Sequence, residues 1–189
     1  MLRNTKTSWG TVSRAFHWIL GLAIIGMMAY GWWMNHIVPR PDRFFHRSIH
    51  ADIGYVILLV MVVRLIWRSM NPVPALAGSS RWERILARAN HWALYGTTIV
   101  VALLGWAHSG AQKPDYADWF GLFRVPQFTS TNKASAHFYQ DWHITMAYLL
   151  IALTVIHILA MLYHHFVKRD TVASRMIGYQ SRLSRSPSN

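Results

Sequence analysis

The chain has 189 residues, of which 53% are apolar and only 14% are charged, and its formal net charge is +12. This composition is far from that of a typical soluble domain and favours a membrane protein of one domain. The absence of cysteine excludes disulfides, thiolate metal sites and covalent c-type haem attachment, which needs a Cys-x-x-Cys-His sequence. In so apolar a chain, the positive charge indicates basic loops at a membrane surface, and we expect no binding of nucleic acid.

Four apolar segments follow one another along the chain, and each predicts a helix. The helices are expected at about residues 15–34, 49–68, 90–108 and 142–166. Each segment has roughly the 20 residues that a helix needs to cross the hydrocarbon core of a bilayer. The sequence therefore predicts an all-α integral membrane four-helix bundle, in a single domain of residues 1–189, with lipid as its surroundings. A soluble four-helix bundle is the alternative.

The distribution of lysine and arginine predicts the orientation of these helices. Thirteen of the 19 lie in the N-terminal arm, in the second connection with its flanks and in the C-terminal tail, whereas six lie in the other two connections. Cytoplasmic loops carry the excess of positive charge in membrane proteins, so both termini are expected in the cytoplasm. We expect residues 170–189 to form a cytoplasmic tail that is partly disordered. No small-residue cleavage pattern follows the first segment, which favours a retained helix over a signal peptide.

The third connection, from about residue 109 to residue 141, is longer than a simple turn between helices. Several large apolar residues gather near its middle, at 119–123. We expect a short amphipathic piece here, lying on the outer surface of the membrane.

The stretch HITMAYLLIALTVIH places His143 and His157 at the two ends of an apolar run. On an α-helix, fourteen residues rise about 21 Å and bring the side chain back to within about 40° of the same face. This separation is too large for both histidines to bind one metal ion. The fourth helix is therefore expected to present two imidazoles toward the same side at two depths in the membrane.

Two further histidines lie at matching depths. His17 is near the cytoplasmic end of the first segment and pairs by depth with His157, while His50 is near the outer end of the second and pairs with His143. Ionisable groups inside a membrane span are costly and usually functional. Two bis-histidine sites, one above the other, are suited to two b-type haems, since neutral imidazole is an axial ligand of haem iron.

The sequences around these histidines resemble the bacterial cytochrome b561 family of small four-helix di-haem membrane cytochromes. The matching pieces are RAFHWIL, SIHADIGYVILLVMVVRL, DWHITMAY and VIHILAMLYHHFVKRDTVASRM, with a looser match at LARANHWALYG. The resemblance implies that His17, His50, His143 and His157 are the iron ligands of two haems b, in a multi-pass protein of the bacterial inner membrane. His46, one turn before His50, and His137, before the last segment, are alternative ligands.

Other residues fit the same plan less specifically. Gly54, one turn after His50, suits either close approach of a flat macrocycle or helix packing. Arg64 lies at the expected depth of the inner haem, where its guanidinium either pairs with a haem propionate or anchors the helix at the surface. Asp52 is the one acid within a span, and it departs from what the resemblance leads us to expect, so its role is open.

Two haems hold two electrons, as many as a quinone needs. In the resembling family, the paired histidines at the place of His164 and His165 lie near a quinone site. Our candidate contact for ubiquinone is His164, and His91 at the inner end of the third segment is a further candidate. The alternative is that these histidines only lie at the membrane interface.

Three arginines precede the outer histidine, Arg40, Arg43 and Arg47. Positive charge near a haem edge attracts a small anion and raises its encounter rate. Members of the resembling family are implicated in taking an electron from superoxide at the outer face and passing it to ubiquinone, which suggests a superoxide:ubiquinone oxidoreductase. Lipid headgroups or haem propionates are alternative partners of these arginines. The alternative function is a cytochrome b subunit that relays electrons between quinone and a separate dehydrogenase or hydrogenase; a non-redox metal or proton carrier is the weakest hypothesis.

Overall fold

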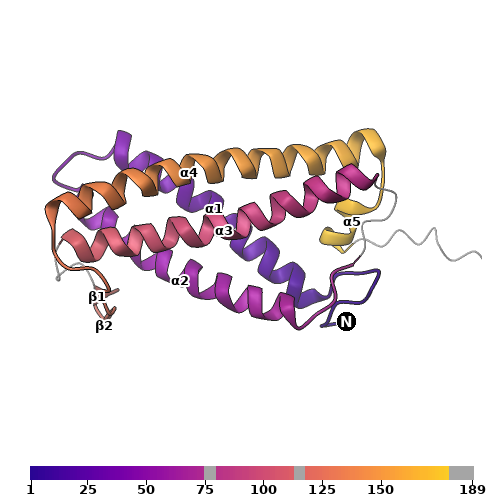
Figure 1. The fold of residues 1–189 in the computed structure, drawn as a ribbon, viewed down its shortest axis with the longest axis horizontal. Helices are drawn as coiled ribbons and strands as arrows, with labels where there is room; N and C mark the ends of the chain where they lie inside the picture. The colour runs from indigo at the N-terminus through magenta and orange to yellow at the C-terminus, as the bar shows by residue number, and fades with distance from the viewer. Residues whose placement is uncertain (75–79, 113–117, 179–189) are drawn as a thin grey trace, which may run out of the picture.

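The computed structural model describes residues 1–74, 80–112 and 118–178. Four long helices lie side by side in this part of the chain: α1 (Thr11–His36), α2 (Arg43–Ser69), α3 (Arg81–Gln112) and α4 (Lys133–Leu162) (Figure 1). A π-helix, η2 (Tyr163–Lys168), continues α4, and the short helix α5 (Val172–Ile177) follows it. Helix α1 packs mainly on α2 and α3 mainly on α4, while α2 and α3 join the two pairs.

A hairpin of two short antiparallel strands, β1 (Asp118–Trp119) and β2 (Phe123–Arg124), lies between α3 and α4 in the sequence. It forms part of the third connection, where the sequence predicts an amphipathic piece. Figure 1 shows it at one end of the bundle, here called the hairpin end, with the N-terminus and α5 at the other, the α5 end. The large side chains of Phe120, Leu122 and Phe123 are exposed. Residues 170–178 of the predicted tail include α5, and 179–189 lie outside the described residues.

Three stretches of helix are long and apolar enough to cross a membrane: Thr11–His36, Arg43–Ser69 and Lys133–Lys168. They expose large apolar side chains over much of their length, as expected where lipid surrounds the protein. Helix α3 is not among the three, and its apolar stretch contains the polar residues Thr97 and Thr98. The chain is thus a largely helical membrane protein, and the fourth span remains a prediction.

The ends of the helices follow local signals rather than the limits of the apolar segments. Helix α4 begins at Lys133, nine residues before the predicted start, because the side chain of Asn132 accepts hydrogen bonds from the backbone N–H groups of Ala134 and Ser135. The π-helix ends at Lys168, because the next residue, Arg169, has a left-handed backbone with φ of 52°. Between the two ends of the bundle, Leu20, Ile57, Met61 and Tyr95 form the buried apolar core.

Asp52 attaches the hairpin to α2. Its side chain is buried, with 4% of the residue exposed, and its carboxylate accepts a hydrogen bond of 3.1 Å from the backbone N–H of Phe120. The indole N–H of Trp119 donates to the Asp52 backbone carbonyl at 3.3 Å. Phe120 and Gly121 take left-handed backbone conformations, with φ of 45° and 72°, which turns the chain between the strands. The acid whose role the sequence leaves open therefore holds a loop.

Asp52→Ala is expected to free the hairpin, because the Phe120 N–H loses its acceptor at a cost of about 1–3 kcal/mol of local stability. Hydrogen exchange at the Phe120 amide should become faster by about tenfold or more. Asp52→Asn is the matched control, since its amide oxygen still accepts the bond and should preserve most of the protection. Equal exchange rates in the wild type and Asp52→Ala would show that other contacts hold the hairpin.

Candidate functional site

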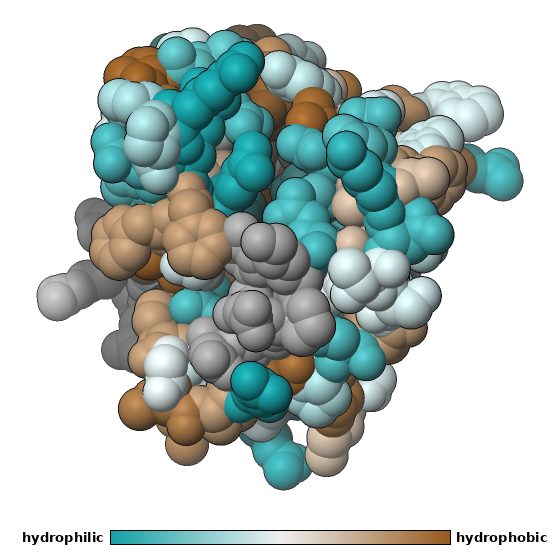
Figure 2. All heavy atoms as spheres, turned by 90° about the vertical axis from the view of Figure 1, so that its left-hand side faces the viewer, coloured by the Kyte–Doolittle hydropathy of each residue, from teal (hydrophilic) through white to brown (hydrophobic). Residues whose placement is uncertain are grey.

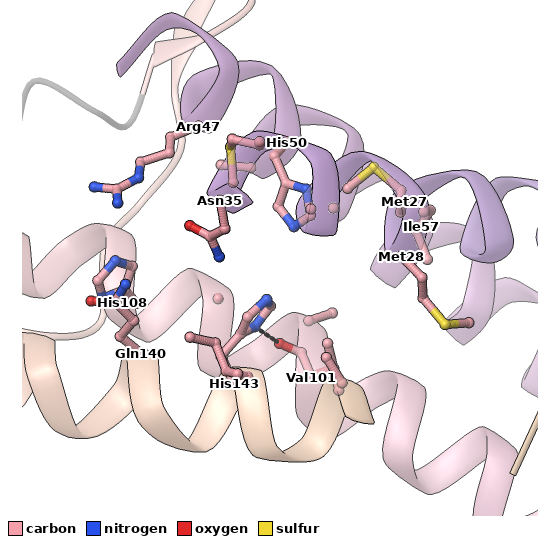
Figure 3. A pocket seen from close by; sticks show the side chains of 18 of the residues that line it. Met27, Met28, Asn35, Arg47, His50, Ile57, Val101, His108, Gln140 and His143 are labelled. Carbon is pink, nitrogen blue, oxygen red and sulfur yellow. Dashed lines mark hydrogen bonds between the residues drawn. The ribbon is translucent and has the colours of Figure 1, made fainter. Parts of the chain in front are cut away.

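A cavity of about 240 Å³ opens between the four long helices near the hairpin end. His50 of α2 and His143 of α4 lie on opposite sides of it, with ring centroids 6.1 Å apart and ring planes at 79° (Figure 3). Gly54 also lines the cavity, and a Cβ added there would meet no atom within 4 Å. The missing side chain therefore leaves room beside the two imidazoles.

Helix α3 positions the His143 ring. The Nδ1–H of His143 donates to the backbone carbonyl of Val101 at 2.9 Å, which leaves the lone pair on Nε2. A Cβ on Gly105 would lie 3.2 Å from both Cε1 and Nδ1 of the same ring. A backbone carbonyl and a glycine one turn later thus set the orientation and the tautomer that a metal-binding imidazole needs.

Helix α1 packs against the His50 ring in a similar way. A Cβ on Gly31 would lie 3.2 Å from His50 Cε1, and the neighbouring Tyr30 ring stacks on the imidazole, with centroids 6.1 Å apart and planes at 14°. The Nδ1 atom of His50 is buried and has no hydrogen-bond partner within the described residues. An unsatisfied buried polar atom is unusual, and it is consistent with a site that a bound group completes.

A second group of histidines lies toward the α5 end. The ring centroids of His17 and His157 are 6.0 Å apart, with planes at 61°, and His91 of α3 lies 5.4 Å from His157. Arg64 of α2 lies beside this group, with Nη2 at 3.4 Å from His17 Nδ1 and the guanidinium above the Tyr95 ring. Because a guanidinium only donates, His17 Nδ1 is the acceptor in this contact.

Both pairs have a separation that one metal ion can span. An ion with an imidazole nitrogen on each side, at bond lengths of about 2 Å, holds the two ring centroids roughly 6 Å apart. No group of three or more His, Cys, Asp or Glu side chains suited to a metal ion occurs in residues 1–74, 80–112 and 118–178. An ion bound by two imidazoles alone needs further ligands, which the macrocycle of a haem supplies.

The alternative ligands lie elsewhere. His46 is a hydrogen-bond partner of the Tyr30 hydroxyl, at 2.8 Å from its Nδ1, and does not line the cavity of His50 and His143. His137 is exposed on the first turns of α4. The structure therefore brings His50 and His143 together and leaves these two histidines outside the pair.

The three arginines surround a separate pocket at the hairpin end, which Arg40, Arg43, Phe44 and Arg47 line. Arg43 Nε donates to the Val38 carbonyl at 2.8 Å, which holds the start of α2 against the preceding loop. Figure 2 views this end of the bundle and shows hydrophilic side chains gathered on it. A pocket lined by three guanidinium groups attracts small anions.

His164 lies on the π-helix at the α5 end and pairs with an acid that the sequence reasoning did not consider. Its Nδ1 is 2.5 Å from Oδ2 of Asp170, and Asp170 Oδ1 accepts the N–H of Val172 at the start of α5. The next histidine, His165, is exposed. Single turns of π-helix are frequent at functional sites because they change the direction in which side chains point.

An ion pair between Lys168 and Glu83 connects η2 to the first turn of α3. The hydrogen bond from Lys168 holds the pKa of Glu83 below its ordinary value, so the carboxylate stays charged. On the other side, the indole N–H of Trp18 donates to the Met176 carbonyl of α5. The segment after α4 is thus attached to both α1 and α3.

The fold and its facing imidazoles define a class, a helical membrane protein for electron transfer. Residues 8–179 match the family model described as prokaryotic cytochrome b561. The chain is 34% identical over 182 residues to cytochrome b561 homolog 2 of Escherichia coli K12, with 94% of this chain and 95% of that protein covered. It is 26% identical over 163 residues to the probable superoxide oxidase CybB of Yersinia pestis, with 85% and 90% covered.

The chain therefore belongs to the prokaryotic cytochrome b561 family, whose members are membrane electron-transfer proteins that bind haem b. The family predicted from the sequence is thereby confirmed.

Proposed function

We propose that the protein carries two haems b and transfers electrons from superoxide at the periplasmic face to ubiquinone in the bacterial inner membrane. The observation that carries the proposal is that two imidazoles face each other at each of two places. The ring centroids are 6.1 Å apart near the hairpin end and 6.0 Å apart near the α5 end. The similarity to a protein named probable superoxide oxidase supports superoxide as the electron donor. The excess of basic residues around the α5 end supports a cytoplasmic location for both termini.

His50 and His143 are the proposed ligands of the outer haem, and His17 and His157 those of the inner haem. When bound, the two haems supply one-electron carriers in series between the membrane faces. Arg64 is the proposed partner of an inner haem propionate, since a guanidinium binds a carboxylate through two hydrogen bonds. Its present contact with His17 Nδ1 does not suit ligation, because the tautomer that accepts there carries its proton on Nε2. A propionate would draw the guanidinium away and leave His17 free to ligate.

At the hairpin end, the arginine pocket concentrates superoxide near the outer site by charge attraction. Superoxide gives up one electron and leaves as dioxygen, so no protein group has to bind it in a shaped pocket. Two superoxide ions supply the two electrons, and two protons from the cytoplasmic side complete the conversion of ubiquinone to ubiquinol.

At the α5 end, His164 is the proposed quinone contact. The Asp170 carboxylate accepts a hydrogen bond from His164 Nδ1–H at 2.5 Å, and when the ring also carries a proton on Nε2, that N–H donates to a quinone oxygen. A carboxylate–imidazole pair of this kind holds a proton at a defined atom and transfers it when the oxygen becomes basic. His91 packs on His157 and is therefore a less suitable quinone contact.

The ligand assignment predicts different haem contents in two α5-end variants. His157→Ala should lose one haem and halve the haem-to-protein ratio, because an axial ligand of the inner haem is gone. His91→Ala is the matched control, from the same cluster, and should keep both haems. The ratio is measured from the pyridine haemochrome spectrum of purified protein. If His157→Ala kept both haems and His91→Ala lost one, His91 would be the ligand of the inner haem in place of His157.

The function itself is tested on purified, haem-loaded protein in detergent supplied with superoxide and a short-chain ubiquinone. Fast haem reduction followed by catalytic quinol formation is the expected result. Haems that dithionite reduces but superoxide does not would refute the oxidase and favour a cytochrome subunit that needs a separate redox partner protein.

The quinone assignment predicts a variant that separates the two half-reactions. His164→Ala should leave haem reduction by superoxide unchanged and lower the rate of quinol formation by about 100-fold, as expected for loss of a group that transfers protons. His165→Ala, the exposed neighbour, should change neither rate by more than about twofold. Stopped-flow haem spectra and quinol absorbance follow the two steps, and equal effects of the two variants would remove His164 from the site.

A further inference from the structure

The cavity between His50 and His143 has two unlike ends. Toward the middle of the bundle, Met27, Met28 and Ile57 line it, and toward the hairpin end Asn35, Arg47, His108 and Gln140 do so (Figure 3). The two imidazoles lie between these groups. The cavity is therefore apolar on one side of the histidine pair and rich in hydrogen-bonding groups on the other.

This gradient matches the chemistry of a haem b, which has apolar edges and one edge that carries two carboxylates. Burying a carboxylate away from water is costly unless a cation or several donors pair with it. The carboxylate edge must therefore face the hairpin end, while the apolar edges contact the methionines. Apart from its histidines, the cavity lining in the described chain contains one basic side chain, Arg47, and no acidic one.

We propose that Arg47 binds a carboxylate of the outer haem, with the side-chain amides of Asn35 and Gln140 as neutral donors beside it. This inference rests on the proposed haem between His50 and His143. Arg47 extends from α2, one turn before His50, so that the ligand and the carboxylate partner come from one rigid helix. Figure 3 shows its guanidinium directed over the polar end of the cavity, across from Gln140 and His108 of the facing helices.

Arg47 thereby differs from the other two arginines. Arg40 and Arg43 line only the surface pocket, whereas Arg47 lines both that pocket and the cavity. The charge of Arg47 is neutralised by the haem carboxylate, and Arg40 and Arg43 supply the attraction for superoxide. Arg47 would then bind the haem carboxylate beside the surface pocket that attracts the anion.

The test compares Arg47→Gln with Arg40→Gln in haem-loaded protein. Redox titrations followed by visible spectra give the midpoint potential of the outer haem, recognised as the component that is missing in His50→Ala. Transfer of haem to an excess of apo-myoglobin gives its rate of loss. Arg47→Gln should lower the potential, because a positive charge near the carboxylate favours the reduced haem, and should speed haem loss by about 10- to 100-fold, since a charge-assisted hydrogen bond contributes 1.5–3 kcal/mol.

Arg47→Lys should restore the potential in part, as it keeps the charge but not the two parallel hydrogen bonds. Arg40→Gln should leave potential and haem loss unchanged and lower only the rate of reduction by superoxide, with a weaker dependence on salt. The proposal would be overturned if Arg47→Gln matched Arg40→Gln in the midpoint potential, in the rate of haem loss and in the rate of reduction by superoxide. A wild type without an outer haem would overturn the proposed function as well, whereas absence of superoxide oxidation with the Arg47 effects intact would overturn the oxidase function alone.

Discussion

The separation of two imidazoles that face each other across the bundle is the constraint on which the rest of the structure depends. It occurs twice, and α4 takes part both times, through His143 and His157. The partners come from α2 near the hairpin end and from α1 near the α5 end. Helix α4 must therefore remain regular between its two histidines. Helix α2 must pack at a distance that brings His50 opposite His143, and α1 at one that brings His17 opposite His157. Regular α-helix does continue to Leu162, and the π-helix begins only after His157.

The bundle meets this constraint because its helices leave a cavity beside the facing imidazoles and do not fill it with side chains. Gly31 and Gly105 receive the edges of the two rings near the hairpin end, and the cavity beside them stays open. Leu20 is the one large side chain in the described residues with less than 2% exposure. An unfilled cavity loses the dispersion contacts of its walls. The proposed haem would fill this space, and it would stabilise the folded state by binding to it and not to the unfolded chain.

The two ends of the bundle carry different polar chemistry. Near the hairpin end, guanidinium groups dominate, which suits an anionic donor and the carboxylates of a haem. Near the α5 end, His164 pairs with Asp170 and Lys168 with Glu83, so that positive and negative groups are close together. The His164–Asp170 pair is the one proposed to hold and transfer a proton, which the reduction of a quinone needs and the oxidation of superoxide does not. This difference agrees with electron flow from the hairpin end to the α5 end.

The sequence by itself determined the properties that follow from local pattern and length. The apolar segments predict helices, the fourteen-residue spacing of His143 and His157 puts them on one face, and matching depths select His17 and His50 as partners. The helices and the shared face follow because helical periodicity is a property of neighbouring residues. The structure places His17 near His157 and His50 near His143, and their role as iron ligands stays a prediction. The sequence could not decide between His46 and His50 as the iron ligand, since the two residues lie about one helical turn apart.

Only the tertiary structure decided which groups surround each histidine. Val101 accepts the bond from His143, Phe120 donates to Asp52, and Asp170 accepts from His164, and none of these partners can be read from a helical period. Val101 and Phe120 come from other segments, and the bond to Asp170 depends on the turn that the chain makes after the π-helix. The same is true of Arg47, whose place at the polar end of the cavity depends on α1, α3 and α4 packing around it. Contacts between segments are set by how whole helices pack, which depends on many side chains at once, so a pattern within one segment does not specify them.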